Sequence, residues 1–598
     1  MENKKQAIIL SGVAIVALLA LIIGATYAYF RASGNSGSNT DINVTTYTLD
    51  LLSFEMGSDI KINADQTSFA SGKGNATGST FAKAILTANN KTNTATKNYY
   101  MYLNISNNTF TYTQNENTPE LLLTITDVSG NAITSITGLT YKTVIDGKGT
   151  SVSGFDITTK SGLLTLFDNR EITASPTKTE EWNVTVTFVN YNVNQTGNAG
   201  KSFNAKLMIQ QEEYELTLAD ICAGKTLSDC VISQYTGTQG DNALYYHNST
   251  LTNGAGDNSY RYAGGDYVLT EAGKATGATM MIGYNNSVTT ALIDFYCNGT
   301  KQYVGYASSC STSHYYLIKG DTTQYQTYNE ALNASVEKGY LTKDNVKNFV
   351  CFGSDATTCP TENLYRIIGV FNNHVKLIKY DYAKSSLLGT DGDFSQEYTS
   401  NYFSGEQGES PSSNSLYYWN NAGTNTWSAS KLNTVNLNTN FTTNIGTAWA
   451  NKIATTTWKV GGGTYANLRD AVPKTAYQYE VGSSASTTTY DAKIGLMYVS
   501  DYYYSASPSA WTLVGYNSDY TKSYASAKGE NWLYGGGWDW TISRYSGDSH
   551  DAFAVRGYGD VGYNDVDNDY GVRPSFSLLS STTYVSGSGS MSDPVRIN

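Results

Sequence analysis

Residues 531–574, near the end of the chain, combine a regular apolar pattern with small polar residues. The segment reads NWLYGGGWDWTISRYSGDSHDAFAVRGYGDVGYNDVDNDYGVRP. We expect a packed framework from its apolar residues and those just after it: Trp532, Trp538, Trp540, Ile542, Phe553, Val572, Pro574 and Phe576. The intervening residues are mostly Tyr, Asp, Asn, Ser and Gly. Tyr supplies rigid amphipathic area and the others supply adaptable hydrogen bonds, so the segment indicates a binding surface before it indicates a catalyst.

Length and charge restrict the classes of protein. A chain of 598 residues indicates several domains. Only 15% of its residues are charged, and it contains 49 Tyr and 55 Gly, which is typical of a β-rich extracellular surface. The net charge is −12 and no basic cluster exists beyond Lys4 and Lys5, which argues against nucleic acid as a partner.

The N-terminus carries a membrane signal. Residues 7–30 are uncharged and would span roughly 36 Å as a helix, enough for a ~30 Å hydrocarbon core. Lys4 and Lys5 favour retention of the N-terminus inside the cell. The same run could be a cleaved signal peptide, with Thr26 and Ala28 before the cut. In both cases the rest is exported, either to the extracellular face of the membrane or as a secreted protein, and residues 31–40 form a linker.

Six cysteines agree with export. They are Cys222, Cys230, Cys297, Cys310, Cys351 and Cys359. Many pairings are conceivable, but the spacing of close neighbours indicates three short local loops. There is no CxxC motif, and the four His residues lie at no zinc-ligand spacing. We therefore expect structural disulfides and no metal.

Two extracellular domains are expected. Residues 41–213 contain alternating segments such as 99–105, 121–128 and 182–193, which predict a β-sandwich acting as a spacer or scaffold. Residues 214–598 open with a short helix and contain an insertion at 265–348, with helical patches at 289–297 and 328–341. Asn372 and Asn373 indicate a hairpin turn, and residues 492–504 and 571–579 read as strands.

Six motifs support a family resemblance. In order they are YRIIGVFNNHVKLI, TWKVGGGTYANLRDAV, AKIGLMYVSDYYY, WDWTISR, YGVRPSFSL and GSGSMSDPVRIN. Together they resemble a domain of exported Firmicutes proteins that is similar to the C-type-lectin-like fold, which formylglycine-generating enzymes also use. The TYAYF sequence at 26–30 resembles camelysin-like biofilm-fibre proteins. The resemblance implies a multidomain protein with an N-terminal transmembrane helix or signal, a β-sandwich, and an α+β C-type-lectin-like domain at 214–598.

The same resemblance places ligand contacts in residues 543–570. The candidate residues there are Tyr545, Asp548, His550, Asp551, Tyr558, Asp560, Tyr563, Asn564, Asp565, Asp567, Asp569 and Tyr570. This location is also the variable region in target proteins of diversity-generating retroelements, where adenine-directed mutagenesis cannot produce Lys, Glu, Gln, Met or Trp. None of those five occurs from 543 to 590. A diversified loop, an ordinary binding loop and a purely structural loop all remain open.

Metal binding and catalysis have weaker support. Asp565, Asp567 and Asp569 follow the spacing of a calcium loop, but Tyr570 and Phe576 replace the Gly and Glu that an EF-hand needs. A lectin-like calcium site and a solvated strand face remain, and we favour the latter.

The oxidase chemistry of formylglycine-generating enzymes needs a late cysteine pair, and no cysteine follows Cys359. The glycine triplets at 461–463 and 535–537 lack the lysine of a phosphate loop. We expect no cofactor and no enzyme. Arg366, Arg544 and Arg573 are expected to pair with carboxylates.

These features predict an adhesin-like cell-surface protein. Its partner would be a protein or glycan on a host or bacterial surface, bound through residues 543–570. The alternative is a structural protein of the envelope or of biofilm fibres that self-assembles through the 41–213 sandwich.

Overall fold

The computed structural model describes residues 50–64, 73–89, 94–214, 216–278, 280–282, 291–302, 310, 313–343, 345–398 and 414–598. Its contacts divide the chain into two compact units, with the boundary between Leu216 and Thr217. The boundary expected from the sequence lies between residues 213 and 214. The predicted anchor or signal and the linker at 31–40 lie outside the described residues. Within the described ranges, no helix combines the length and the apolar character needed to cross a bilayer.

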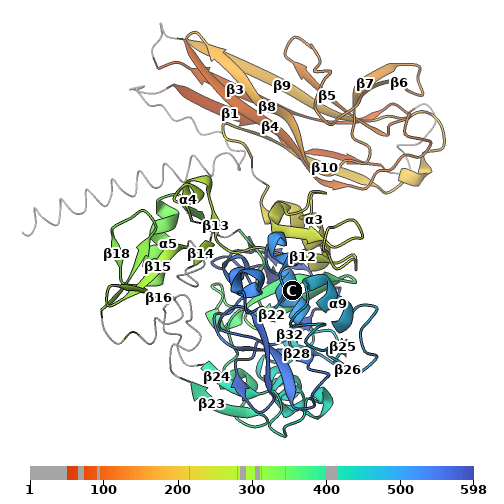
Figure 1. Ribbon diagram of the computed structural model, residues 1–598. Helices are drawn as coiled ribbons and strands as arrows, with labels where there is room; N and C mark the ends of the chain where they lie inside the picture. Colours follow the sequence, from red (N-terminus) through yellow and green to blue (C-terminus); the bar gives the residue numbers. More distant parts are fainter. Residues whose placement is uncertain are drawn as a thin grey trace, which may run out of the picture. The chain divides into compact units, whose positions relative to one another are not determined.

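The first unit contains two antiparallel sheets (Figure 1). One has the order β1-β3-β9-β5-β7-β6, formed by Leu51–Met56, Ala76–Thr87, Thr177–Phe188, Leu121–Asp127, Ser151–Asp156 and Tyr141–Ile145. The other has the order β2-β10-β4-β8, formed by Ile60–Asn63, Ser202–Gln210, Ala95–Asn108 and Gly162–Ala174.

Alternation along these strands creates a shared core. In β3, Ala82, Ala84 and Leu86 are fully buried while the residues between them are partly exposed. Leu103 of β4 and Leu207 of β10 supply the facing side from the other sheet and belong to the same cluster of buried residues. Because successive strand residues point to opposite faces, this pattern requires a second layer on one side. The two sheets are sandwich-like, as the sequence pattern predicts.

The second unit is organised around an antiparallel sheet of seven strands. Its order is β11-β12-β21-β22-β32-β27, with β20 also paired to β21; the strands are Leu244–Tyr246, Tyr260–Tyr262, Leu364–Phe371, His374–Lys379, Ser575–Ser577, Ile494–Gly495 and Phe349–Cys351. The predicted hairpin is confirmed, because β21 and β22 are joined by Asn372 and Asn373, with φ of 49° and 63°. Only Ser575–Ser577 of the predicted 571–579 strand is extended into this sheet.

The predicted insertion leaves and returns to this sheet. Strand β12 precedes it and β20 follows it, and both pair with β21. Its elements are β13 (Val268–Leu269), α4 (Glu271–Ala275), β14 (Met280–Ile282), β15 (Ala291–Cys297), β16 (Thr300–Gln302), β17 (His314–Ile318), β18 (Gln324–Tyr325), α5 (Tyr328–Glu337) and β19 (Leu341–Thr342). They pack around their own core, which includes Leu292, Tyr316 and Leu332, and form a separate lobe (Figure 1).

Two secondary-structure predictions are wrong. In the predicted helix at 289–297, the described residues 291–297 instead form strand β15, which pairs with β14, β16 and β17. Residues 492–504 are strand only at Ala492, where β26 (Thr489–Ala492) ends, and at β27, and then form helix α10, Val499–Tyr504. The side chain of Asp501, in the first turn of that helix, accepts the backbone N–H of Tyr498 at 2.8 Å. The tyrosines of the helix are buried. The prediction of a helix in 328–341 is confirmed over α5.

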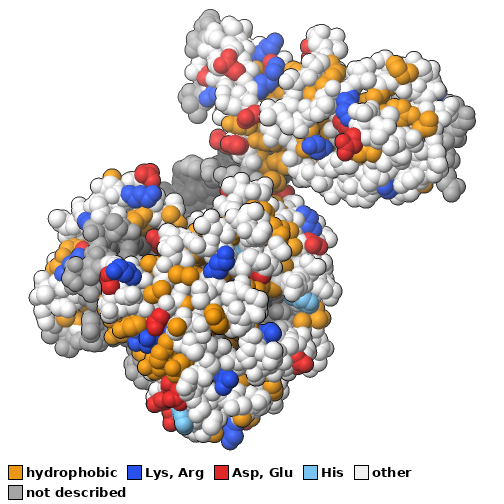
Figure 2. All heavy atoms as spheres, turned by 45° about the vertical axis from the view of Figure 1, so that its right-hand side comes forward, with side chains coloured by type: hydrophobic (Ala, Val, Ile, Leu, Met, Phe, Trp, Pro, Cys, Tyr) orange, Lys and Arg blue, Asp and Glu red, His pale blue; other side chains and the backbone are white. Residues whose placement is uncertain are grey.

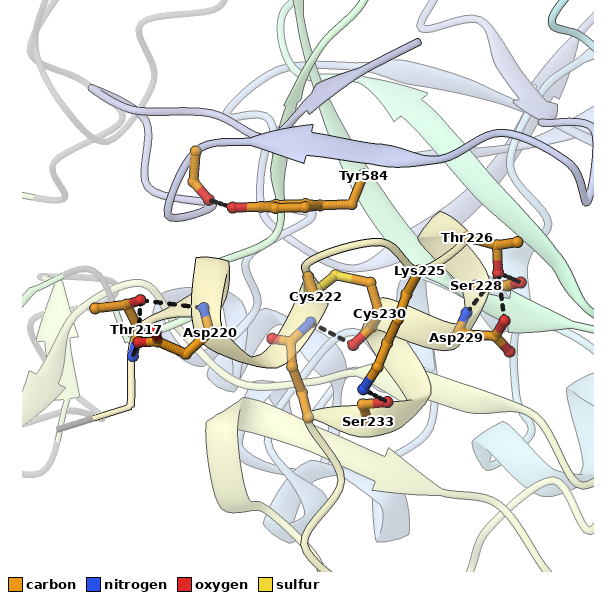
Figure 3. Close-up of a disulfide and its surroundings, with 12 residues drawn as sticks. Thr217, Asp220, Cys222, Lys225, Thr226, Ser228, Asp229, Cys230, Ser233 and Tyr584 are labelled. Atoms are coloured by element: carbon orange, nitrogen blue, oxygen red, sulfur yellow. Dashed lines mark hydrogen bonds between the residues drawn. A yellow bond between two sulfur atoms is a disulfide. The ribbon is translucent and has the colours of Figure 1, made fainter. Parts of the chain in front are cut away.

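The three disulfides have the local pairings that the spacing indicates: Cys222–Cys230, Cys297–Cys310 and Cys351–Cys359. The first joins α2 (Leu218–Cys222) to α3 (Leu227–Ser233), as Figure 3 shows. Thr217 and Thr226 cap these helices by accepting the backbone N–H groups of Asp220 and Asp229. The short helices are thus fixed by caps and a covalent link rather than by length.

The second unit also contains smaller sheets and short helices outside the seven-stranded sheet and the insertion. The sheets are β23-β24-β31 (Phe394–Tyr398, Asn414–Tyr418, Asp569–Tyr570), β25-β26 (Thr456–Lys459, Thr489–Ala492), β28-β29-β30 (Asp539–Arg544, Asp551–Val555, Val561–Asp565) and β33-β34 (Tyr584–Ser586, Arg596–Ile597). The helices are α6 (Ser385–Leu388), a π-helix (Leu432–Phe441), α7 (Thr442–Asn444), α8 (Thr447–Ala450) and α9 (Pro473–Glu480).

The predicted carboxylate pairing of arginines is confirmed for two of the three. Arg366 binds Asp266 through two hydrogen bonds of 2.6 and 2.7 Å. Arg573 binds Asp539 at 2.5 Å, with both side chains buried. The prediction is wrong for Arg544, whose guanidinium donates to the carbonyl of Gly461 at 3.0 Å. These pairs join distant segments of the second unit.

Candidate ligand-binding site

Residues 543–570 occupy one three-stranded sheet and its loops. Strands β28, β29 and β30 pair in sequence order, and β31 then pairs with β24. Trp540, Ile542, Phe553 and Val572 are at most 1% exposed, and Trp532 is 5% exposed, so these framework residues form the predicted core. Trp538 is partly exposed and stacks on Tyr570 with 4.8 Å between ring centroids.

A buried asparagine holds the loop between β28 and β29. The side-chain amide of Asn425 donates to the backbone carbonyls of Tyr545, Asp548 and Asp551, at 2.8, 2.6 and 2.7 Å. The backbone N–H of Asn425 also donates to the carbonyl of Ser549 at 2.7 Å. Because Asn425 is 2% exposed, the amide group that binds these carbonyls is shielded from water.

The glycine triplet at 461–463 packs against the same loop. Gly462 has φ of 62°, and a Cβ there would lie 1.9 Å from the carbonyl oxygen of Arg544. The backbone N–H of Ser546 donates to the carbonyl of Gly463 at 2.9 Å. Only glycine permits this approach of two backbones, and the approach brings Tyr465 beside Tyr545.

Three half-buried tyrosines form the tyrosine cluster: Tyr465, Tyr545 and Tyr563. The ring centroids of Tyr465 and Tyr545 are 4.1 Å apart, with planes 7° from parallel. Those of Tyr465 and Tyr563 are 4.3 Å apart, at 26°. Burial, followed by a hydrogen bond with Tyr563, raises the pKa of the Tyr465 phenol. The Tyr465 hydroxyl is therefore neutral, and the three stacked rings present aromatic surface.

Arg469 contacts two members of the tyrosine cluster. The Arg469 guanidinium lies 4.4 Å from the ring centroid of Tyr465 and 5.5 Å from that of Tyr563. It also lies 5.1 Å from Tyr516, and so does the Arg556 guanidinium. Such contacts contribute ~0.5–1 kcal/mol each at exposed sites. The cluster is thus held in place before any ligand arrives.

The turn between β29 and β30 is closed by an ion pair. Arg556 donates to Asp560 through Nε at 2.9 Å and also through Nη2. Asp560 is fully buried, so the prediction that it contacts a ligand is wrong: its carboxylate compensates Arg556. Tyr558 lies at the tip of this turn and is 41% exposed, as expected of a contact residue.

Several carboxylates lie close together at the other end of the β28-β29-β30 sheet. Asp551 and Asp565 are direct cross-strand partners on β29 and β30. Burial, followed by the charges of Asp548 and Asp565, raises the pKa of Asp551 to about 6. Asp551 is only 8% exposed, so it too is better placed to orient its neighbours than to contact a ligand. Asp565 is exposed.

Asp548 and His550 lie together on the exposed loop. Asp548 accepts the backbone N–H of His550 at 2.9 Å, and this bond lowers the pKa of the Asp548 carboxyl. The His550 ring nitrogen Nδ1 lies 3.1 Å from the same oxygen. Both side chains are more than half exposed, so they are accessible to a partner.

The Asp565, Asp567 and Asp569 triplet does not share one strand face, which corrects the favoured interpretation. Strand β30 ends at Asp565, and a turn containing Asp567 precedes β31. Asp569 accepts Ser395 Oγ and Gln396 Nε2, both at 2.7 Å. In the described part of the chain, no group of three or more His, Cys, Asp or Glu side chains is arranged to hold a metal ion.

The predicted contact residues therefore separate into two groups. Exposed or partly exposed are Tyr545, Asp548, His550, Tyr558, Tyr563, Asn564, Asp565, Asp567, Asp569 and Tyr570. Asp551 and Asp560 are buried. Tyr570 is partly exposed but lies between Trp538 and Trp540, which makes it part of the framework.

The sequence pattern did not predict that Tyr465, Arg469 and Asn425 belong to the site, because only folding brings them there. The glycine triplet before Tyr465 is the one local signal for a close backbone approach. Asn425 has no such signal, because its partners lie 120 to 126 residues away.

A buried carboxyl group anchors the start of the loop region. Glu480 accepts the backbone N–H groups of Val499 and Ser500 at 2.9 and 2.8 Å, and also the Ser543 hydroxyl. Burial raises the pKa of Glu480 to about 6. Glu480 thereby links the end of α9, the start of α10 and the end of β28.

Comparison with known proteins gives no assignment. No protein-family model matches the chain, and no curated protein is significantly similar to it.

Proposed function

We propose that this chain is an adhesin-like cell-surface protein whose second unit, a C-type-lectin-like domain, binds a protein or glycan through the tyrosine cluster and the loops beside it. The observation that carries the proposal is the stacking of Tyr465, Tyr545 and Tyr563 at the surface. Rigid aromatic faces bind partners at low entropic cost, and the adjacent Asp and Asn side chains accept hydrogen bonds.

The chemical environment supports an extracellular partner. Three disulfides indicate an oxidising, extracellular location. On the face of the molecule seen in Figure 2, charged side chains form small groups separated by larger uncharged areas. Recognition at such a surface depends on shape, aromatic area and hydrogen bonds rather than on electrostatic attraction.

The test is a loss of binding without a loss of folding. The double variant Tyr545→Ser/Tyr563→Ser should bind at least tenfold more weakly than wild type to an array of defined oligosaccharides and surface proteins. Tyr479→Ser is the matched control, because Tyr479 is 38% exposed on α9, outside the cluster. Wild-type binding by a folded double variant, or no binding by the wild type, would overturn the proposal.

Diversification of the loop is a further part of this proposal. The exposed candidates alternate with buried framework residues that diversification would have to spare. Sequencing the neighbouring DNA checks the idea, because a reverse-transcriptase gene and an invariant near-copy of the segment encoding 543–570 should be present. If neither is found, the loop is an ordinary binding loop.

A structural role in fibres is the second candidate. Strand β6 is an edge of the six-stranded sheet, and Ile145 at its end is 60% exposed. An exposed apolar edge can pair with a strand of another molecule. Ile145→Lys should then reduce concentration-dependent self-association of the full chain in sedimentation velocity. A wild-type chain that stays monomeric at all concentrations would remove this candidate.

A further inference from the structure

A second recessed site lies away from the tyrosine cluster. It is a pocket of about 450 Å³ beside the Cys351–Cys359 loop. Strands β21 and β22 contribute Tyr365 and Lys379 to its lining, and α6 contributes Ser386 and Leu387. The volume is within the range of sites that hold small molecules.

Lys379 is the unusual component of this pocket. It is only 3% exposed. Its ammonium group forms no hydrogen bond or ion pair with any other described residue. The ammonium nitrogen lies 5.9 Å from the ring centroid of Tyr365. An unpaired cation in a buried position is costly, and an anion placed against it would remove that cost.

The charges around Lys379 do not neutralise it by contact. Burial is the main influence and lowers the pKa of Lys379 to about 8; the charges of Asp381 and Glu362 oppose this shift, and those of Lys384 and Arg573 add to it. Asp381 accepts the backbone N–H of Tyr382 at 2.7 Å. Lys379 therefore carries most of its charge at neutral pH without a bound counter-ion.

Two asparagines provide acceptors in the same lining. Asn363 donates its amide N–H to the carbonyl of Phe352 at 3.0 Å, and Asn444 donates to the carbonyl of Leu387 at 2.9 Å. One N–H of each amide is thus used by the backbone, and no other described group donates to either amide oxygen. Each oxygen can accept hydrogen bonds from a ligand that carries hydroxyl groups.

We propose that this pocket binds a polyhydroxylated carboxylate of monosaccharide size, a uronic acid being the type, with the carboxylate against Lys379 and hydroxyl groups against the amide oxygens of Asn363 and Asn444. This site is independent of the tyrosine cluster and of the function proposed for it. The carboxyl groups of Asp381 and Glu362 and the ammonium group of Lys384 also line the pocket, so its charged side chains balance before a ligand binds, and the two carboxyl groups accept further hydroxyl groups.

The test is isothermal titration of the full chain with glucuronate, glucose and acetate. Glucuronate should bind, glucose should bind at least tenfold more weakly because it lacks the charge, and acetate should bind at least tenfold more weakly because it lacks the hydroxyls. Lys379→Met should lower the glucuronate affinity at least tenfold. Lys474→Met, at an exposed position on α9, is the control and should have no effect.

A second variant separates the two contacts. Asn444 is exposed at the pocket rim, so Asn444→Leu leaves the core intact. It should weaken glucuronate about fivefold and leave acetate unchanged. Glucuronate affinity of the wild type should also fall between pH 6.5 and pH 9.5, as Lys379 loses its proton, while the residual affinity of Lys379→Met stays constant.

Several outcomes would overturn this site. They are absence of glucuronate binding, equal affinity for glucose or for acetate, unchanged affinity in folded Lys379→Met, unchanged affinity in Asn444→Leu, or a wild-type affinity independent of pH. None of them affects the tyrosine cluster, whose test uses different residues and ligands.

Discussion

The side-chain amide of Asn425 donates a 2.8 Å hydrogen bond to the backbone carbonyl of Tyr545, 120 residues further along the chain. The same amide group reaches the carbonyls of Asp548 and Asp551. One buried side chain thus fixes three points of the loop that carries a member of the tyrosine cluster. The position of Tyr545 therefore depends on a residue that is itself inaccessible to any ligand.

Asn425→Ala should destabilise the loop and the second unit together. The variant removes the side-chain donor from three carbonyls, of which that of Asp551 keeps the backbone N–H of Tyr545. Each carbonyl left without a donor costs ~1–3 kcal/mol where water cannot enter. We expect a loss of ~2–4 kcal/mol in the free energy of unfolding and faster hydrogen exchange at residues 545–551. Chemical denaturation and exchange mass spectrometry measure the two effects.

Asn421→Ala is the control for that variant, because Asn421 is exposed in the same connection. It should change the unfolding free energy by less than ~0.5 kcal/mol. Unchanged exchange at 545–551 in Asn425→Ala would mean that the three hydrogen bonds do not hold the loop.

Asp565→Asn should stabilise the sheet at alkaline pH. Asp551 has a folded pKa of about 6, above its ordinary value of 3.8, because of burial first and nearby carboxylates second. A raised carboxyl pKa means that the folded state holds a proton that the unfolded state releases, so stability falls as pH rises from about 4 to 6. Removing the cross-strand charge should recover ~0.5–1 kcal/mol at pH 8.

Thermal unfolding of Asp565→Asn at pH 4 and pH 8 measures this effect. The gain should be present at pH 8 and small at pH 4, where Asp551 is protonated in wild type. Asp567→Asn is the matched control, since Asp567 lies in the following turn and is not among the charges that shift Asp551. An equal gain from both variants would show a general effect of net charge.

Short-range patterns allowed most of the framework to be predicted. Alternation predicted the sandwich-like first unit, cysteine spacing predicted the disulfides, and Asn372 with Asn373 predicted the β21–β22 hairpin. Each of these signals acts within a few residues, or repeats along every strand, and it can therefore be read without knowledge of the fold.

The failures have a common physical cause. Residues 289–297 carry an apolar run that suits either a helix or a strand, and pairing with β14 and β17 selects the strand. Asp560 looks like an exposed turn residue until Arg556 is placed beside it. Tyr465, Arg469 and Asn425 join the site only through tertiary contacts. Local sequence does not encode which distant segment will supply a partner.

Glu480→Gln should change the pH dependence of stability. Burial raises the folded pKa of Glu480 to about 6 from 4.5. Between these values the folded state retains a proton that the unfolded state has lost, so wild type loses up to ~2 kcal/mol as pH rises from 4 to 7. The Gln variant cannot titrate and should lose less over this interval.

Denaturation of wild type and Glu480→Gln at pH 4 and pH 7 measures how much unfolding free energy each protein loses over this interval. The comparison within each protein removes the constant cost of replacing a carboxyl oxygen by an amide NH₂ group near the backbone N–H groups of Val499 and Ser500. Parallel pH profiles for the two proteins would show that the pKa of Glu480 is the same in the folded and unfolded states.

Lys379→Met should raise the stability of the chain near neutral pH. Lys379 is buried without an ion pair to any described residue, and burial lowers its folded pKa to about 8 from 10.5. The unfolded state therefore binds the proton more tightly, and wild-type stability should rise as pH increases from about 8 to 10.5. Below pH 8 the buried charge costs up to about 3 kcal/mol, which methionine avoids at similar length.

Thermal unfolding at pH 7 should show a higher melting temperature for Lys379→Met, with a smaller gain at pH 9.5, while the exposed Lys474→Met should show none. A lower melting temperature for Lys379→Met at pH 7 would mean that the ammonium group is stabilised in the folded chain.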